Sequence, residues 1–409
     1  MMDQPIVVAI DIGTQKICTL VAQVEGDKIF RILGVGIEPS LGIKRGTVID
    51  ITSATQCIAR SIEKAQRSSG LEITSAIVSL SGSHISSINS RGVVGIAGRI
   101  IEQADIARAL EAAQAVAIPH NREIIHVIQR GFTVDGQDGI HMPIGMHGFR
   151  LEVEAHIITA ASATVENIRQ AVQSAGVTPV QFVLNPLAAG EVVLSETERQ
   201  MGAVVCDIGA GTTSIAVYVD GDVWHTMVIP LGGNNITNDI AHGLKVPLAE
   251  AEEIKLKHGF SVMSEVNPEE KFTISAFGAD QPVACSRLDL TEIIEARAEE
   301  IFTLLLQEIK RSGFDGLLPA GMVLTGGTSN LPGIRTLATQ VMGVPVRVAR
   351  PDNLLGLTDQ LLTPEFSTSV GLLYWALLMT ESNLPANHGS LTQGTAWKKA
   401  VKWLKGLLP

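Results

Sequence analysis

The stretch DIGAGTT, from Asp207 to Thr213, decides the fold. Apolar runs at residues 202–206 and 214–219 flank it, which predicts a strand, a tight turn and a second strand. Glycines let the backbone N–H groups of such a turn approach an oxyanion, and Thr212 and Thr213 add hydroxyl donors. Asp207 would repel a phosphate unless a hydrated divalent cation, Mg²⁺ by preference, lies between them. A simpler interpretation is a hairpin with a glycine-rich turn and no ligand.

The same layout occurs near the start of the chain. The segment IVVAIDIGTQKICTLVAQV, from Ile6 to Val24, again places Asp11 and Gly13 between two apolar runs. The two copies lie about half the chain apart, which predicts two similar lobes that each offer a phosphate loop to a shared cleft. A third glycine-rich loop, LTGGTSNLPG at Leu324–Gly333, follows an apolar run and precedes a helix-like stretch.

Length, charge and cysteine usage limit the possible classes of protein. A chain of 409 residues predicts two to four domains, and its net charge of −11 argues against a nucleic-acid partner. The scattered cysteines have no metal-binding spacing and are expected to be reduced and buried; they are Cys18, Cys57, Cys206 and Cys285. We expect no signal peptide at MMDQP, and the apolar run Leu372–Met379 is too short to span a bilayer.

The pattern of elements predicts an α/β protein with an insertion. Residues 1–84 read as strands of a mixed sheet with a helix at Ser53–Ser69, which Asp50 would cap and Gly70 would end. Between residues 85 and 160 glycines crowd, and five histidines occur without regular spacing, which argues against a metal site.

Five motifs together resemble those of the actin and sugar-kinase ATPase superfamily. They are the two DIG loops, LNPLAAG at Leu184–Gly190, GGTSNLPG at Gly326–Gly333 and FSTSVGLL at Phe366–Leu373. The segment His126–Ile157 resembles the insertion that is specific to the FtsA family of bacterial actin-like cell-division proteins.

The resemblance implies a two-lobed actin-like ATPase fold of the α/β class. It adds a family-specific strand–helix–strand–strand insertion and a C-terminal amphipathic helix. The implied divisions are 1–84, subdomain 1A with the first phosphate loop; 85–160, the inserted subdomain 1C; 161–200, the return to 1A and the inter-lobe linker; 201–241, subdomain 2A; 242–300, subdomain 2B; 301–345, 2A with the adenosine loop; 346–380, the closing segment of 1A; 381–395, a flexible linker; and 396–409, a membrane-targeting helix.

The implied ligand is ATP with Mg²⁺. Asp11 and Asp207 would hold the metal through water, and Thr14 and Lys16 would meet the terminal phosphate. The implied nucleotide-binding residues are Asp11, Gly13, Thr14, Gln15, Lys16, Asp207, Gly209, Ala210, Gly211, Thr212, Thr213, Glu252, Lys255, Gly326, Gly327 and Thr328. From spacing alone, Glu252 and Lys255 share a helix face and are equally well explained as a solvated ion pair.

The inter-lobe linker is where relatives carry the polar residue that positions the attacking water. Here the candidates are Asn185, where several relatives have Glu, and Gln181. A neutral amide orients water but does not act as a base near pH 7, so we expect weak or no ATPase activity. Asn185 is also explained as a turn or cap residue.

In the FtsA family, subdomain 2B receives the acidic C-terminal tail of the tubulin-like protein FtsZ. Arg287 and Arg297 are candidates to pair with that peptide, although both are also explained as ordinary surface arginines.

The stretch AWKKAVKWLKGLL, Ala396–Leu408, separates into two faces on a helix. Tryptophan favours the headgroup boundary and lysine favours anionic lipid, so we expect a membrane-surface helix. The expected contacts are Trp397, Lys398, Lys399, Val401, Lys402, Trp403, Leu404, Lys405, Leu407 and Leu408. A helix packed on the protein's own surface is the alternative.

The resemblance implies an ATP-binding protein that self-assembles, tethers FtsZ filaments to the cytoplasmic face of the inner membrane at the septum, and recruits later division proteins through residues 85–160. Two alternatives stay open. An ATP-dependent small-molecule kinase needs a catalytic carboxylate facing a substrate, and an actin-like platform of type IV pilus assembly lacks the lysine-rich tail.

Overall fold

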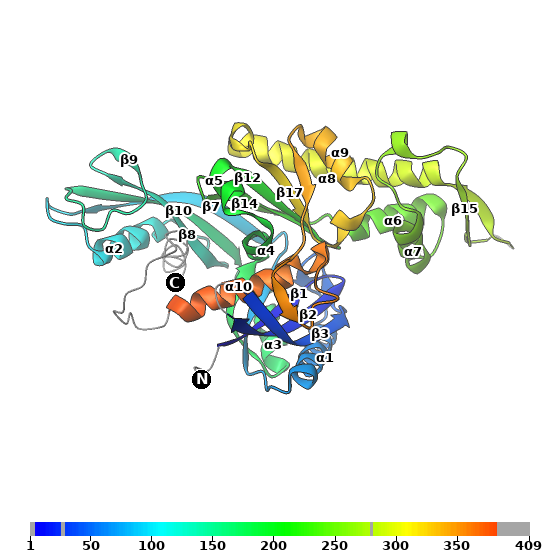
Figure 1. Ribbon diagram of the computed structural model, residues 1–409, viewed down its shortest axis with the longest axis horizontal. Helices are drawn as coiled ribbons and strands as arrows, with labels where there is room; N and C mark the ends of the chain where they lie inside the picture. Colours follow the sequence, from blue (N-terminus) through cyan, green and yellow to red (C-terminus); the bar gives the residue numbers. More distant parts are fainter. Residues whose placement is uncertain (1–4, 26–28, 279–280, 383–409) are drawn as a thin grey trace.

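The structure is a computed structural model that describes residues 5–25, 29–278 and 281–382. Figure 1 shows an elongated molecule with one sheet-containing lobe above another. A small subdomain with α2 and β8 projects from one end of the long axis, and α7 and β15 lie at the opposite end. The expected two-lobed α/β fold with an insertion is therefore confirmed.

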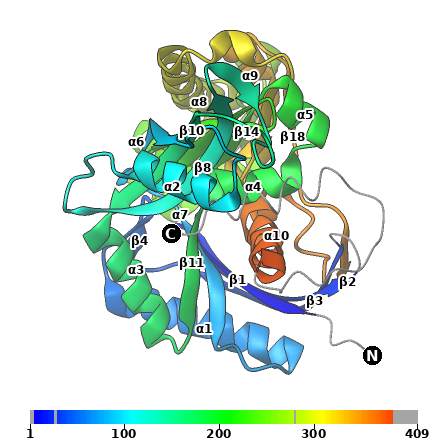
Figure 2. The ribbon, with the colours of Figure 1, turned by 90° about the vertical axis from the view of Figure 1, so that its left-hand side faces the viewer.

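The first lobe is a six-stranded sheet in the order β11-β6-β1-β2-β3-β19. Its strands are β1 (Ile6–Ile12), β2 (Lys16–Glu25), β3 (Ile29–Pro39), β6 (Ser75–Leu80), β11 (Thr178–Leu184) and β19 (Leu354–Gly356). A short hairpin of β4 (Ile43–Lys44) and β5 (Thr47–Val48) follows β3. In Figure 2 the helices α1 (Ile51–Ser69) and α3 (Ser162–Ser174) lie below this sheet, and α10 (Ser367–Ser382) lies above it.

Local capping sets the ends of α1. The Asp50 carboxylate accepts hydrogen bonds from the backbone N–H groups of Thr52 and Ser53, and Gly70 closes the helix with φ of 71°. The apolar positions Ala54 and Ile58 face the sheet and are buried. The predicted helix is confirmed and begins two residues earlier than expected.

The second lobe repeats the arrangement of the first. Its sheet has the order β14-β13-β12-β17-β18, and β12 pairs antiparallel with β13 and parallel with β17, as β1 pairs with β2 and β6. The strands are β12 (Ala203–Ile208), β13 (Thr213–Val219), β14 (Asp222–Ile229), β17 (Gly321–Thr325) and β18 (Val346–Val348). The helices that accompany this sheet are α5 (Glu196–Met201), α8 (Arg287–Ser312) and α9 (Ile334–Met342), with 3₁₀ turns η2 (Asp315–Leu317) and η3 (Gly327–Asn330).

The inserted subdomain has one more strand than the resemblance implies. It contains β7 (Ile85–Gly95), α2 (Gln103–Gln114), β8 (Arg122–Val134), β9 (Gln137–Ile140) and β10 (Arg150–Ala161), in the sheet order β7-β10-β8-β9. The short strand β9 exists because Asp135 and Gly136 both take positive φ, which turns the chain back along β8.

The outer subdomain, expected at residues 242–300, shares the helices α6 (Gly233–Leu244) and α8 with the rest of the second lobe. The helix α6 crosses the expected boundary at 241/242, and α8 crosses the one at 300/301. The closing segment of the first lobe was expected to begin at residue 346, but β18 still belongs to the second sheet. The remaining elements are α7 (Leu248–His258), η1 (Met263–Glu265), β15 (Lys271–Ile274) and β16 (Val283–Ser286). Ile236, Ile254, Phe272 and Leu290 belong to its own core.

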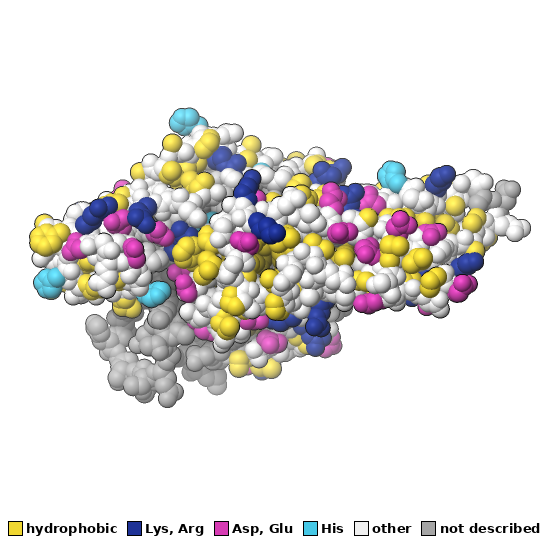
Figure 3. All heavy atoms as spheres, turned by 90° about the horizontal axis from the view of Figure 1, so that it is seen from above, with side chains coloured by type: hydrophobic (Ala, Val, Ile, Leu, Met, Phe, Trp, Pro, Cys, Tyr) yellow, Lys and Arg dark blue, Asp and Glu magenta, His cyan; other side chains and the backbone are white. Residues whose placement is uncertain are grey.

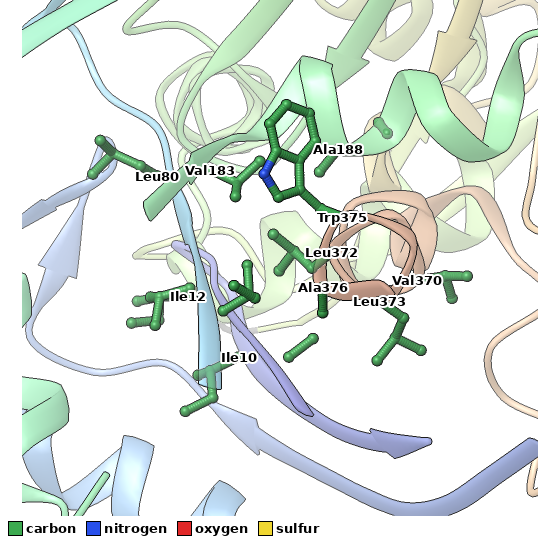
Figure 4. Packing of buried hydrophobic residues seen from close by; sticks show 14 of the residues in the cluster. Ile10, Ile12, Leu80, Val183, Ala188, Val370, Leu372, Leu373, Trp375 and Ala376 are labelled. Atoms are coloured by element: carbon green, nitrogen blue, oxygen red, sulfur yellow. The ribbon is translucent and has the colours of Figure 1, made fainter. Parts of the chain in front are cut away.

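The helix α10 forms the core between the lobes. Figure 4 shows Leu372, Leu373 and Trp375 of α10 among Ile10 of β1, Val183 of β11 and Ala188 of α4 (Asn185–Val193). The sequence of α10 is apolar on all sides because other parts of the protein enclose the helix. In the described part of the chain, no helix is long and apolar enough to cross a membrane. On the face shown in Figure 3, basic and acidic side chains are interspersed.

A close helix contact gives the first prediction. A Cβ added at Gly371 in α10 would lie 1.9 Å from the carbonyl oxygen of Ala188 in α4. Helix propensity alone makes Gly→Ala stabilising by about 1 kcal/mol, but this clash should make Gly371→Ala destabilising by about 1–3 kcal/mol. Urea unfolding measures the difference. Gly243→Ala, which meets only the end of the Ile293 side chain, is the control and should stay within about 1 kcal/mol of wild type.

Candidate functional site

A cavity of about 360 Å³ lies where the three glycine-rich loops meet. The turn between β1 and β2, the turn between β12 and β13, and the segment after β17 each line it, and α7 adds three side chains. The expected ligand residues that line the cavity are Asp11, Gly13, Thr14, Gln15, Lys16, Asp207, Gly209, Ala210, Gly211, Thr212, Glu252, Lys255, Gly326, Gly327 and Thr328.

The first two loops have the same internal geometry. In the first, the N–H of Gly13 donates to the carbonyl of Lys16 at 2.9 Å, and in the second, the N–H of Gly209 donates to the carbonyl of Thr212 at 2.9 Å. Within the described residues, the turn amides of Thr14, Gln15, Ala210 and Gly211 have no hydrogen-bond acceptor. Each turn therefore has backbone donors available for an anion in the cavity.

Neighbouring hydroxyls at the start of α10 hold the two carboxylates. The Ser369 hydroxyl donates to Asp11 Oδ2 at 2.7 Å, and the Thr368 hydroxyl donates to Asp207 Oδ2 at 3.1 Å. Burial raises the pKa of Asp11. Burial, and then the negative charge of Asp11, raise the pKa of Asp207 to about 6. Two buried carboxylates with raised pKa values suit a shared cation.

Glycine is required where the loops approach one another. A Cβ at Gly211 would lie 2.6 Å from Thr14 Oγ1, so the two turns face each other directly. Gly326 has φ of 84°, and a Cβ there would lie 2.3 Å from Asp207 Oδ1. By contrast, a Cβ at Gly327 meets nothing closer than 3.6 Å, so this position has room for a side chain.

Lys255 is buried and Glu252 half-buried, and the two side chains belong to a hydrogen-bond network with Thr237. Lys255 is 8% exposed, and its ammonium donates to Glu252 Oε2 at 2.7 Å and to the Thr237 hydroxyl at 2.8 Å. The Thr237 hydroxyl also donates to Glu252. The pair joins α7 to α6 at the edge of the cavity, with Leu256 beside it.

Asn185 and Gln181 lie in different surroundings. Asn185 begins α4, lines the cavity, and its amide lies against Asp207, while its buried Oδ1 has no hydrogen-bond partner in the described structure. Gln181 is not among the residues that line the cavity, because β11 directs its amide oxygen to the indole N–H of Trp375 at 3.1 Å. Thr213 is also absent from the lining, since its hydroxyl donates to the carbonyl of Leu231 within the second lobe.

Several cavity residues were not predicted. Thr368 lies within the FSTSVGLL segment, which the sequence indicated only as a segment, and Glu365 lies immediately before it. Gly46 and Ser81 carry no signal that sequence reasoning could use. The Ser81 hydroxyl lies 3.1 Å from the hydroxyl of Thr212, so it joins the lobes beside the second loop.

The remaining expected sites lie elsewhere. Arg287 is paired with Glu270, and Arg297 with Asp239 and Glu300; both arginines are on α8, away from the cavity. The expected membrane helix at 396–409, together with residues 383–395 of the linker, falls outside the described residues.

The fold and the paired loops define an actin-like protein. Among solved structures, the chain resembles MreB 5 of Spiroplasma citri bound to AMPPNP, with a TM-score of 0.58 and 12% identity over 92% of this chain and 97% of that one. It also resembles the PilM-PilN type IV pilus biogenesis complex, with a TM-score of 0.63 and 18% identity over 91% of this chain and 98% of that one.

Comparison with family models and with related sequences identifies the family within the class of actin-like proteins. The model "Cell division protein FtsA" matches residues 204–371, and the model "SHS2 domain inserted in FTSA" matches residues 82–159. Cell division protein FtsA of Pseudomonas aeruginosa is 42% identical over 91% of this chain and 89% of its own length. Cell division protein FtsA of Escherichia coli K12 is 37% identical over 99% of this chain and 97% of its own length. The chain belongs to the FtsA family of cell division proteins, and its role is in bacterial cell division.

The second prediction concerns the buried carboxylate pair. In the folded state the pKa of Asp207 is about 6, above its unfolded value of 3.8, so the ligand-free protein loses stability as pH rises through that interval. Asp207→Asn should therefore be more stable than wild type at pH 7, by on the order of 2 kcal/mol, and should lose this advantage below pH 4. Denaturant unfolding without nucleotide and Mg²⁺ measures the difference. Asp359→Asn removes an exposed carboxylate and is the control. Equal stability of Asp207→Asn and wild type at pH 7 would contradict a raised pKa of Asp207 in the folded protein.

Proposed function

We propose that the cavity binds ATP together with Mg²⁺. The observation that carries the proposal is the pair of identical turns facing each other across two buried carboxylates. The turn amides of both loops would bind the phosphates, and Asp11 and Asp207 would hold hydrated Mg²⁺. Lys255, Glu252 and the third loop would bind the nucleoside.

The residues present fit both groups. A carboxylate pair whose pKa values are raised by burial gains stability when a cation neutralises it. Asn185 Oδ1 is buried without a partner, which suits a hydrogen bond to a water of the ligand shell. Bound Mg²⁺ would offset the repulsion between the phosphates and the carboxylates.

We expect weak or absent hydrolysis because Asn185, the linker candidate to position the water, is a neutral amide, and the nearby carboxylates have other partners: Asp11 and Asp207 would hold the cation, and Glu365 pairs with Lys16. Asn185 is neutral, and the side chains of Ser81, Thr212 and Thr368 are neutral hydroxyls. These groups orient water without accepting its proton at pH 7. The nucleotide would thus act mainly as a structural and switching ligand that holds the lobes together.

Nucleotide binding is tested by a substitution that fills the cavity and spares the fold. Gly327→Val points branched carbons into the cavity from a position with room for Cβ, so ATP·Mg²⁺ affinity should fall by at least about 100-fold while the unfolding midpoint stays near that of wild type. Gly327→Ala, the smaller control, should lose less. Isothermal calorimetry with ATP and Mg²⁺ measures both. Wild-type affinity in Gly327→Val would refute the site.

We further propose that the protein tethers FtsZ filaments to the cytoplasmic face of the inner membrane at the division septum. Membership of the FtsA family supports the partner. Because the chain has a net charge of −11, attraction to anionic lipid would depend on the tail lysines. The tail residues Trp397, Val401 and Leu404 would enter the headgroup boundary.

The FtsZ tail would dock on the outer subdomain. This subdomain forms one end of the long axis in Figure 1, and Phe277, which follows β15 in the chain, is 70% exposed. Arg287 and Arg297 already have carboxylate partners, so an acidic peptide would share or displace those partly buried pairs. The inserted subdomain, at the opposite end, would contact neighbouring subunits and later division proteins.

Tethering is tested by reconstitution on anionic vesicles. The full chain should pellet with vesicles and recruit FtsZ filaments, because the tail anchors and the outer subdomain docks. Truncation after Gly394 and Trp397→Glu should abolish pelleting, while Lys402→Arg, which keeps the charge, should not. Charge reversal of Arg287 and Arg297 together should keep pelleting and weaken FtsZ recruitment, more strongly at low salt. Equal recruitment by all variants would contradict the proposal.

A further inference from the structure

The ammonium group of Lys16, in the first phosphate loop, is held by the segment that closes the cavity. Lys16 Nζ donates to the main-chain carbonyl of Glu365 at 2.8 Å and lies 3.5 Å from Glu365 Oε2. It also lies 3.7 Å from the centre of the Phe366 ring. Both Lys16 and Glu365 line the cavity, so a phosphate entering the first loop meets a lysine that already has a carboxylate partner.

The backbone around Glu365 is fixed by the third loop. Glu365 lies in η4 (Pro364–Phe366), and the carbonyl of Pro364 accepts hydrogen bonds from the N–H of Gly326 and from the Thr325 hydroxyl, each at 3.0 Å. The Glu365 side chain is 42% exposed and has room to turn, whereas its main chain does not. Its negative charge therefore stays at the cavity whether or not it touches Lys16.

The cavity lining carries more negative than positive charge, so the carboxylate of Glu365 affects how well the cavity accepts a polyphosphate. The charged lining residues are Asp11, Lys16, Asp207, Glu252, Lys255 and Glu365. Lys255 is paired with Glu252 and Lys16 with Glu365, which leaves two carboxylates without a basic partner in the lining. A polyphosphate thus enters a site of net negative charge, and it gains Lys16 fully only if Glu365 gives up the contact.

We propose that Glu365 determines how tightly this site retains the phosphate chain, by competing with it for Lys16. This inference rests on the proposed nucleotide function and assigns a specific residue to it. The competition lowers the affinity for the nucleotide and speeds its release. It also links the phosphate chain to η4, which directly precedes α10 in the chain and is hydrogen-bonded to the third loop.

The test is a double-mutant cycle on the full chain, read out as ATP and ADP affinity by calorimetry and as release rate by stopped flow. Glu365→Gln keeps the main-chain carbonyl contact and removes the charge, so both nucleotides should bind about tenfold tighter and leave correspondingly more slowly. The gain should shrink as ionic strength rises. In a Lys16→Met background, where the side chain still packs on Phe366, Glu365→Gln should have a much smaller effect.

The controls separate this inference from the proposed function. Asp359→Asn removes an exposed carboxylate that does not line the cavity and should leave both affinities unchanged. Unchanged or weaker binding in Glu365→Gln, or a gain that persists in full with Lys16→Met, would overturn the role of Glu365 alone. Absence of nucleotide binding in wild type and in every variant would overturn the proposed function and this inference together.

Discussion

The arrangement of the site depends on the first turn of α10, where Thr368 and Ser369 donate hydrogen bonds to Asp207 and Asp11. These carboxylates belong to different lobes and lie far apart in the sequence, yet adjacent hydroxyls on one helix fix both. The next residue toward the N-terminus, Ser367, accepts a hydrogen bond from Thr325 at the base of the third loop. One helical turn thereby sets the relative positions of all three loops, and its apolar continuation anchors that turn between α4 and β1.

This constraint explains why the site is unfavourable for folding and suited to a ligand. Burial raises the pKa of both carboxylates, the charge of Asp11 raises that of Asp207 further, and turn amides without acceptors gain little from the folded chain. A cation and an anion bound together would satisfy both sets of groups. Coupling between lobes then follows from the same contacts, because a ligand held by both turns opposes their separation.

Sequence reasoning predicted the repeated strand–turn–strand units and the three loops, because glycine placement and apolar periodicity are local signals. It also placed the start of α1 near Asp50, whose capping hydrogen bonds are local. What it missed depends on tertiary packing. The direction of Gln181 follows from the irregular register between β11 and β6 and from the approach of Trp375. Glu365 enters the site only because Pro364 is tied to the third loop. The strand β9 depends on two consecutive residues with positive φ, Asp135 and Gly136, which turn the chain back along β8.

The most direct measurement is hydrogen exchange at the amides of residues 13–16, 209–213 and 326–328, with and without ATP·Mg²⁺. We expect exchange to slow in all three loops together, and most strongly at the turn amides of Thr14, Gln15, Ala210 and Gly211, because one ligand accepts from both turns. Slowing confined to one loop, or unchanged exchange at saturating ATP·Mg²⁺, would contradict a nucleotide site shared between the lobes.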